Sequence, residues 1–138
     1  MMNAVFQVNW LAVLIASAAH FVLGGLWFAA LFGKQYAAAL GIADRLAQRP
    51  TPLFLVGPLV CGAITIATTA VLLRALGITG YGDGLALGAI VGIGYLGAMT
   101  LNIAINPLFP RPFAYALINA PMFLVGSLLA CLILTAMG

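Results

Sequence analysis

Four long apolar runs constrain this chain more than any other feature of its sequence. They cover about residues 8–32, 53–76, 85–105 and 113–137. Each has at least the roughly 20 residues that a helix needs to cross about 30 Å of hydrocarbon. A spanning segment must be a helix or part of a closed barrel, and these runs lack the alternation of barrel strands. We therefore predict an all-α integral membrane protein, with residues 1–138 as one domain of four transmembrane helices in a small bundle.

The composition also indicates that lipid is the solvent of this chain. Of its 138 residues, 65% are hydrophobic and 5% are charged, whereas a soluble domain is about half apolar and about one quarter charged. So few charges cannot cover a water-exposed surface, and a disordered chain has the opposite composition. The five basic residues are scattered singly and form no patch for nucleic acid. We expect the lipid bilayer as a partner, and no nucleic acid.

The basic residues indicate how the helices are oriented. The first and third loops share one side of the membrane and carry four of the five, whereas the other side carries only Arg74. The four are Lys34, Arg45, Arg49 and Arg111. By the positive-inside rule, these two loops are cytoplasmic and both termini lie outside. We expect the protein in the inner (cytoplasmic) membrane of a bacterium.

The first loop, residues 34–49, allows two interpretations. Apolar side chains such as Tyr36 and Leu40 fit a short helix that lies in the membrane interface and ends at Pro50. An ordinary polar loop fits the same residues, and the sequence does not separate the two.

His20 lies near the middle of the first run, where an ionisable side chain costs the most. At about 1.5 Å per helical residue, the other three runs place hydroxyl side chains at the same depth. These are Thr65, Thr68, Thr69, Tyr95 and Ser127. We expect a midplane polar cluster in which these hydroxyls satisfy the donor and the acceptor of a neutral imidazole. The cluster is either a structural hydrogen bond between helices or part of a path for a proton or a solute.

A second polar group is predicted nearer the cytoplasmic side. Its members are Trp27, Thr100, Asn102, Asn106 and Asn119. Pro121 leaves the carbonyl of Leu117 without its helical partner, which favours a bend and exposes an acceptor beside this group. The group either lines an inner-side pocket, or its asparagines are clamps between helices and helix caps.

Glycines are expected to bring the helices close together. Small-residue faces that favour packing occur at Gly24 and Gly25 in the first run and at Gly88-x-x-x-Gly92 in the third. The helix that packs there belongs either to the same chain or to another subunit. Four helices with short loops enclose little volume, so a pathway is easier to build in a homo-oligomer.

The polar residues exclude several functions. Both acidic residues, Asp44 and Asp83, lie outside the apolar runs, so no carboxylate is available in the membrane to exchange protons for a cation. One histidine and two separated cysteines make neither a catalytic triad nor a metal site. We expect no enzyme, no metal and no cofactor. Two functions remain, an oligomer that binds or passes a small solute or proton and a non-transporting structural or partner-binding subunit.

Two segments resemble a known family. "NWLAVLIASAAHFVLGGLWFAALFGK" contains an Asn-Trp pair, then Gly-x-Leu-Trp-aromatic, then Leu-Phe-Gly-Lys. It resembles the opening signature of the membrane family called domain of unknown function 1761. "TLNIAINPLFPRPFAYALINA" is similar to the third-loop region of that family, with Asn102 and the Ile118-Asn119 pair in matching places. The resemblance implies a four-helix membrane fold and no particular substrate. Met122 and Phe123 stand where the family is expected to show a Tyr-His pair.

Overall fold

The computed structural model describes residues 1–43 and 51–138, and this part of the chain forms helices and no strand. In chain order the elements are α1 (Met2–Phe6), α2 (Trp10–Gly25), η1 (Leu26–Leu31), α3 (Gly33–Leu40), α4 (Pro52–Ala75), α5 (Tyr81–Ala89), η3 (Ile90–Gly97), α6 (Ala98–Ala104) and α7 (Pro112–Met137). Four stretches are long and apolar enough to span a membrane. They are Trp10–Leu31, Pro52–Ala75, Tyr81–Ala104 and Pro112–Met137. The prediction of an all-α protein with four membrane-spanning helices is therefore confirmed.

Polar caps set where two of the spans begin. The side chain of Asn9 accepts a hydrogen bond from the backbone N–H of Ala12, at 3.2 Å, and so caps α2. The hydroxyl of Thr51 accepts one from the N–H of Phe54, at 3.3 Å, and Pro52 occupies the first turn of α4. Each span therefore begins within two residues of the start of its apolar run.

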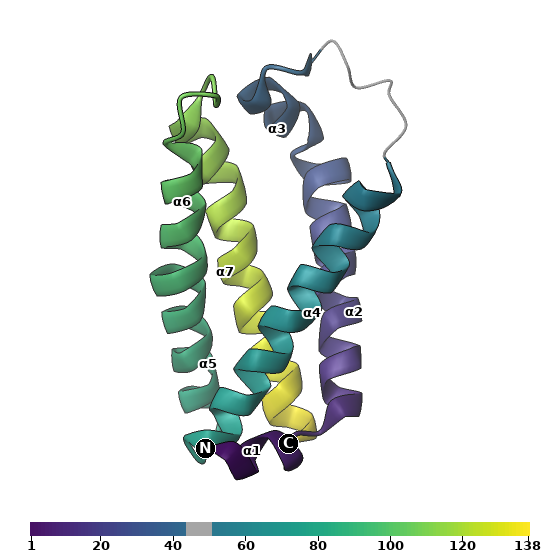
Figure 1. Cartoon of the computed structure of the whole chain (residues 1–138), viewed down its shortest axis with the longest axis vertical. Helices are drawn as coiled ribbons and strands as arrows, with labels where there is room; N and C mark the ends of the chain where they lie inside the picture. Colours follow the sequence, from purple (N-terminus) through teal and green to yellow (C-terminus); the bar gives the residue numbers. More distant parts are fainter. Residues whose placement is uncertain (44–50) are drawn as a thin grey trace.

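Helix α7 is the centre of the bundle (Figure 1). It packs against α2 along one side and against α5, η3 and α6 along another, whereas α4 crosses the bundle obliquely and packs mainly on α2. Both chain termini lie at one end, which we call the termini end. The opposite end carries α3 and the loop between α6 and α7, and we call it the loop end. That the loop end is cytoplasmic stays a prediction of the basic residues.

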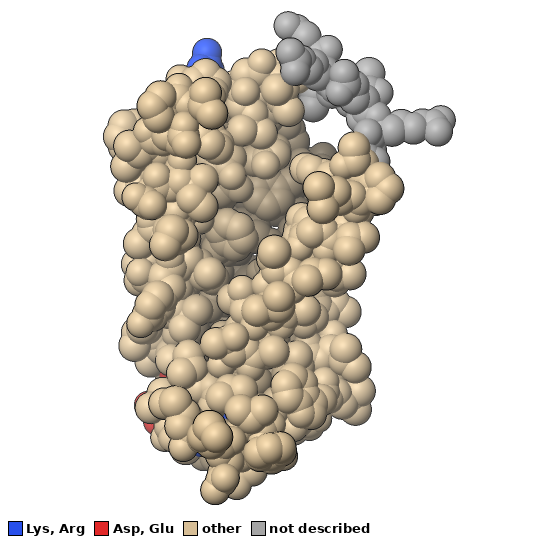
Figure 2. All heavy atoms as spheres, in the orientation of Figure 1, with Lys and Arg blue, Asp and Glu red and all other residues tan. Residues whose placement is uncertain are grey.

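The two halves of the bundle differ in packing. The buried apolar core lies in the half nearer the termini end and is made of Val8, Ala12, Val13, Ala16, Ile66, Ala70, Leu73, Leu87, Val91, Ala130 and Leu134. Toward the loop end, the first ten residues of α4 leave the bundle, and Leu53 is 79% exposed. Figure 2 shows the surface hollowed between this half of α4 and the helices beside it. Charged atoms appear in that view only at the two ends.

Glycines bring α5 and η3 against α7. A β-carbon on Gly88 would lie 3.2 Å from the carbonyl oxygen of Ser127, and one on Gly92 would lie 2.9 Å from the Cα of Leu124. The helix that packs on this face therefore belongs to the same chain. Gly24 meets the Met122 side chain of α7 in a similar way, at 3.1 Å, but Gly25 has nothing within 4 Å. Gly25 therefore makes no close packing contact with another helix that the structure describes.

Two spans contain wide, π-helical turns that hydrophobicity alone does not predict. Segment η1 closes with a hydrogen bond of 2.8 Å from the N–H of Phe32 to the carbonyl of Trp27, five residues earlier. Segment η3 carries Gly92, Gly94 and Gly97, and a β-carbon on Gly97 would lie 3.1 Å from the carbonyl oxygen of Gly92. Such turns shift which side chains face the neighbouring helix, because each adds a residue to the turn.

The first loop begins with a helix. Helix α3 ends at Leu40, and Gly41 stops it with a φ of 70°, in the left-handed region that glycine adopts without strain. Its buried residues, Ala37 and Ala39, show that it packs on the bundle, mainly on α7. Of the two interpretations, a short helix is thus found for the first part of the loop, and its position in the membrane interface stays a prediction. Residues 44–50, including Arg45, Arg49 and Pro50, lie outside the described residues.

Candidate functional site

The imidazole of His20 lies between α4 and α7. A β-carbon on Gly126 of α7 would lie 2.6 Å from its Cδ2 and 2.7 Å from its Nε2, and one on Gly62 of α4 would lie 3.2 Å from its Nδ1. The ring therefore fills the space that two glycines leave open on either side of it. Sequence analysis did not identify Gly62 or Gly126. The available signal was a glycine on each of two other spans near the depth of His20.

The predicted threonine partners of His20 bond elsewhere. Thr65 donates to the carbonyl of Cys61 at 3.0 Å, Thr68 to that of Ile64 at 2.9 Å, and Thr69 to that of Thr65 at 2.9 Å. Each hydroxyl thus bonds to its own helix, because a carbonyl one turn earlier is always within reach. Within residues 1–43 and 51–138, no side-chain hydrogen bond joins His20 to a hydroxyl. The expected hydrogen bonds between His20 and these hydroxyls are therefore absent from the described part of the chain.

The remaining two members of the midplane polar cluster, Tyr95 and Ser127, lie in different environments. Tyr95 is 71% exposed and points away from the bundle, whereas Ser127 is buried on α7 beside Gly126. Tyr95 lies in the π-helical segment η3, where the number of residues per turn departs from the 3.6 of an α-helix. Its side chain therefore points in another direction than the one predicted for a regular α-helix. Sequence analysis missed Ser17, which is 7% exposed and lies three residues before His20 on α2. Its hydroxyl has no hydrogen-bond partner among residues 1–43 and 51–138.

His20 sits where the packed half of the bundle meets the hollowed half. Its neighbour Gly62 lies four residues before Ile66 of the apolar core and ten after Pro52, where α4 begins. The ring is half-buried. In the part of the chain that the structure describes, no three His, Cys, Asp or Glu side chains are grouped so as to hold a metal ion. The chemistry available here is that of one imidazole, which can hold or release one proton and can donate and accept a hydrogen bond.

Two members of the inner-side group stabilise the backbone of α7. The indole N–H of Trp27 donates to the carbonyl of Ile118 at 2.9 Å, and the amide of Asn119 donates to the carbonyl of Tyr115 at 2.8 Å. Both acceptors lie just before Pro121, in the turns whose hydrogen bonding this proline disturbs. Trp27 thereby ties η1 to α7, and Asn119 supports α7 itself.

The other three members of the inner-side group do not lie together with Trp27 and Asn119. Asn106 caps the turn after α6, where its side-chain oxygen accepts from the N–H of Leu108 at 3.0 Å, and Asn102 is exposed. Thr100 is buried and donates to the carbonyl of Leu96 at 2.7 Å. It lines a cavity of about 210 Å³ between α6 and α7. The other walls of that cavity are Leu96, Met99, Ile103, Tyr115 and Phe123. The cavity is thus largely apolar, and the structure does not bring the five predicted residues into one pocket.

Aromatic side chains, which sequence analysis did not group, fill the loop end. The Tyr36 ring of α3 lies with its centroid 4.8 Å from that of Phe28 and 6.0 Å from that of Tyr115, and Phe109 lies 4.7 Å from Tyr115. Burial, followed by the nearby Tyr115, raises the pKa of Tyr36 to about 12. Tyr36 is consequently neutral at physiological pH, and its ring fixes α3 against α7.

The family of this chain follows from its sequence as a whole. Residues 11–135 match the family described as "Protein of unknown function (DUF1761)". The chain belongs to this family. The match covers nearly all of the four spans and the loops between them, and with the four apolar helices it makes this DUF1761 member a membrane protein. No curated protein and no solved structure matches the chain.

Proposed function

We propose that this DUF1761 protein binds or passes a small solute or a proton through the hollowed half of the bundle, with His20 at the boundary of that half. It would do so in the inner membrane of a bacterium, without enzymatic chemistry and as a homo-oligomer, which counting subunits in mild detergent would check. The observation that carries the proposal is the placement of His20. An ionisable ring lies between two glycines, at the boundary of the packed and hollowed halves of the bundle, and no described hydroxyl bonds to it.

The cost of burying a polar group supports a functional partner for His20. A ring nitrogen that finds no hydrogen bond in an apolar environment costs about 1–3 kcal/mol. Ser17, one turn away on the same face, is buried, and its hydroxyl has no hydrogen-bond partner in the described part of the chain. Water or a solute that enters from the hollow would satisfy both groups.

A second candidate is a structural subunit that transports nothing. It is favoured by the hydrogen bonds of the inner side, because Trp27 and Asn119 both bond to the backbone of α7. In that case the glycines around His20 would serve only to pack the ring, and the protein would act by presenting its surface to lipid or to a partner.

Proton flux into liposomes separates the two candidates. The purified protein is reconstituted with a trapped pH-sensitive dye, and a K⁺ diffusion potential drives protons inward. We expect wild type to acidify the lumen faster than protein-free liposomes. His20→Asn should remove this flux, because an amide keeps a donor and an acceptor of hydrogen bonds but does not take up a proton.

The matched control is Thr68→Val, which removes an exposed hydroxyl at the same depth that bonds only to its own helix. It should retain the wild-type flux. A wild-type rate equal to that of protein-free liposomes, with His20→Asn folded normally, would reject proton passage and favour the structural subunit.

A further inference from the structure

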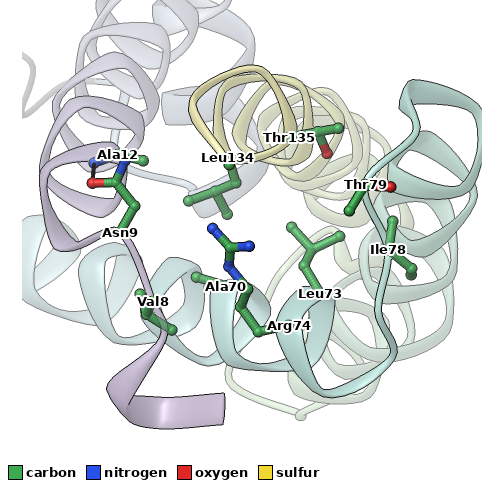
Figure 3. A pocket seen from close by; sticks show the side chains of 11 residues that line it. Val8, Asn9, Ala12, Ala70, Leu73, Arg74, Ile78, Thr79, Leu134 and Thr135 are labelled. Atoms are coloured by element: carbon green, nitrogen blue, oxygen red, sulfur yellow. Dashed lines mark hydrogen bonds between the residues drawn. The ribbon is translucent and has the colours of Figure 1, made fainter.

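Two cavities in the described part of the chain differ in size and in charge. The one at the termini end has a volume of about 60 Å³, and the guanidinium of Arg74 is directed into it (Figure 3). The one between α6 and α7 has a volume of about 210 Å³, and none of the six described residues that line it is charged. For comparison, an apolar cavity of about 150 Å³ in another protein binds benzene. The larger cavity therefore has room for a small organic molecule.

The walls of this larger cavity favour a flat, uncharged molecule. Tyr115 and Phe123 of α7 supply two aromatic rings. The facing segments η3 and α6 supply the aliphatic and thioether side chains of Leu96, Met99 and Ile103. Aromatic rings attract one another in offset or edge-to-face arrangements, and a thioether sulfur makes favourable contacts with a ring. A charged ligand would lose its hydration here without gaining an opposite charge, so the walls select an aromatic molecule over an ion.

The aromatic wall at Tyr115 is held in place by rings outside the cavity. The centroid of its ring lies 4.7 Å from that of Phe109 and 6.0 Å from that of Tyr36. A side chain that is already fixed loses little conformational freedom when a ligand binds against it. This wall is consequently ready for a ligand before the ligand arrives.

The cavity opens at the surface of the bundle. Met99 and Ile103, which line it from α6, are 56% and 51% exposed. Both lie within the third membrane-spanning stretch, Tyr81–Ala104. An apolar molecule dissolved among the acyl chains therefore reaches the cavity without crossing a polar surface.

Thr100 supplies a buried hydrogen-bond acceptor. It is 7% exposed, and its hydroxyl donates to the carbonyl of Leu96 at 2.7 Å. A hydroxyl has one proton and two lone pairs, so this bond leaves only acceptor capacity on the Thr100 oxygen. The complementary group on a ligand is a hydrogen-bond donor, such as a phenol O–H or an indole N–H.

We propose that the cavity between α6 and α7 binds a small uncharged aromatic molecule that carries one hydrogen-bond donor. The donor meets the hydroxyl oxygen of Thr100, and the ring packs against Phe123, Tyr115 and Met99. The competing occupant is an acyl chain of the surrounding lipid, which has neither a ring nor a donor. The site does not include His20 and does not depend on the role proposed for that residue.

Binding is measured on the purified full chain in detergent by nuclear magnetic resonance of isotopically labelled methionine methyl groups. Met99 reports on the cavity, whereas Met1 and Met2, which are 88% and 85% exposed, report on probe dissolved in the micelle. Three probes separate the contributions of ring and donor. Phenol has both, anisole has the ring without the donor, and hexanol has the donor on an alkyl chain.

Phenol should shift the Met99 signal to saturation, through the ring current of the bound probe. Anisole should bind about three- to tenfold more weakly, the loss expected for one neutral hydrogen bond. Hexanol should not displace phenol. Displacement of phenol by hexanol at equal concentration would show a groove for acyl chains and overturn the proposal. A Met99 shift that rises without saturation, as for Met1, would also overturn it.

Thr100→Val tests the acceptor, because it keeps the shape of the side chain and removes the hydroxyl. It should weaken phenol binding about three- to tenfold and leave anisole binding unchanged, so that the two probes bind equally. The matched control is Thr68→Val, which removes an exposed hydroxyl that also bonds to its own helix and should keep the preference for phenol. An unchanged preference for phenol in Thr100→Val would overturn the proposal.

Leu96→Trp tests the location, because the larger side chain fills the cavity. It should abolish saturable binding of phenol, whereas Leu101→Trp, on the same span but outside the cavity lining, should not. Wild-type affinity in a folded Leu96→Trp variant would place the probe elsewhere and overturn the proposal. If Leu96→Trp does not fold, Thr100→Val still decides. None of these variants changes His20, so this test and the proton-flux assay fail independently.

Discussion

At the scale of single residues, the environment of His20 depends on the absence of two side chains. A β-carbon on Gly126 would overlap the ring, and a β-carbon on Gly62 would crowd it. Space for the imidazole thus comes from glycine rather than from polar partners. Each of these glycines therefore determines whether the His20 ring fits, although glycine has no side chain that could bond to it.

A glycine-to-alanine pair tests this dependence. Gly126→Ala places a methyl group 2.6 Å from the Cδ2 of His20, so the ring must move and the protein should lose about 1–3 kcal/mol of stability. Gly25→Ala adds a methyl group with nothing within 4 Å and should not destabilise the protein. Thermal midpoints in one detergent give the comparison. Equal midpoints for the two variants would contradict the assigned position of the ring.

At the scale of elements, α7 holds the bundle together through close contacts with three other spans. The contact with η3 is the least adjustable of those described here, because a β-carbon on Gly92 would meet the backbone of Leu124. Backbone atoms cannot rotate away as a side-chain end can. The contact with η1 is of another kind, a hydrogen bond from Trp27 to the carbonyl of Ile118. Packing and hydrogen bonding thus fix different spans to the same helix.

Two glycines of η3 provide the test at this scale. Gly92→Ala should force η3 away from α7 and lower stability by about 2–3 kcal/mol, near the upper end of overpacking effects. Gly94→Ala, two residues along the same segment, meets nothing within 4 Å and should be tolerated. Unfolding in increasing denaturing detergent measures both. A tolerated Gly92→Ala would mean that η3 does not pack on α7 as described.

At the scale of the whole molecule, the bundle is packed toward the termini and hollowed toward the loops. Leu55 and Val60 of α4 are both 48% exposed. Leu55 shares the helical face of Gly62, seven residues on, which faces His20, whereas Val60 lies on the opposite face. Equal exposure therefore describes two environments, the hollow for Leu55 and the acyl chains for Val60.

Cysteine labelling distinguishes these environments. In a Cys61→Ser background, which removes the exposed native thiol, Leu55→Cys should react with a membrane-impermeant thiol reagent and Val60→Cys should not. Ionised thiol forms in water and not in acyl chains, which is the reason for the difference. Labelling in vesicles of known orientation also reports whether the hollow opens to the cytoplasm. Similar labelling of both positions would exclude a water-filled hollow.

The inner-side residues illustrate how far a local sequence pattern predicts a site. Trp27 and Asn119 were identified as polar residues of the inner side, but their acceptors, the carbonyls of Ile118 and Tyr115, carry no signal in the side-chain sequence. Met122 stands where a family tyrosine was expected and packs against Gly24 instead. Residue type and depth were thus predictable, whereas the partner of each residue was not.

The sequence by itself determined the four spans, their helical state and the depth of His20, because transfer from water to lipid depends on each segment separately and every spanning backbone must satisfy its own hydrogen bonds. Only the tertiary structure decided which faces meet. The threonine hydroxyls donate to carbonyls one turn earlier in their own helix, Tyr95 points outward, and glycines on α4 and α7 enclose the imidazole. Helix rotation and neighbour choice follow from close packing across segments far apart in the chain, and no single segment contains that information.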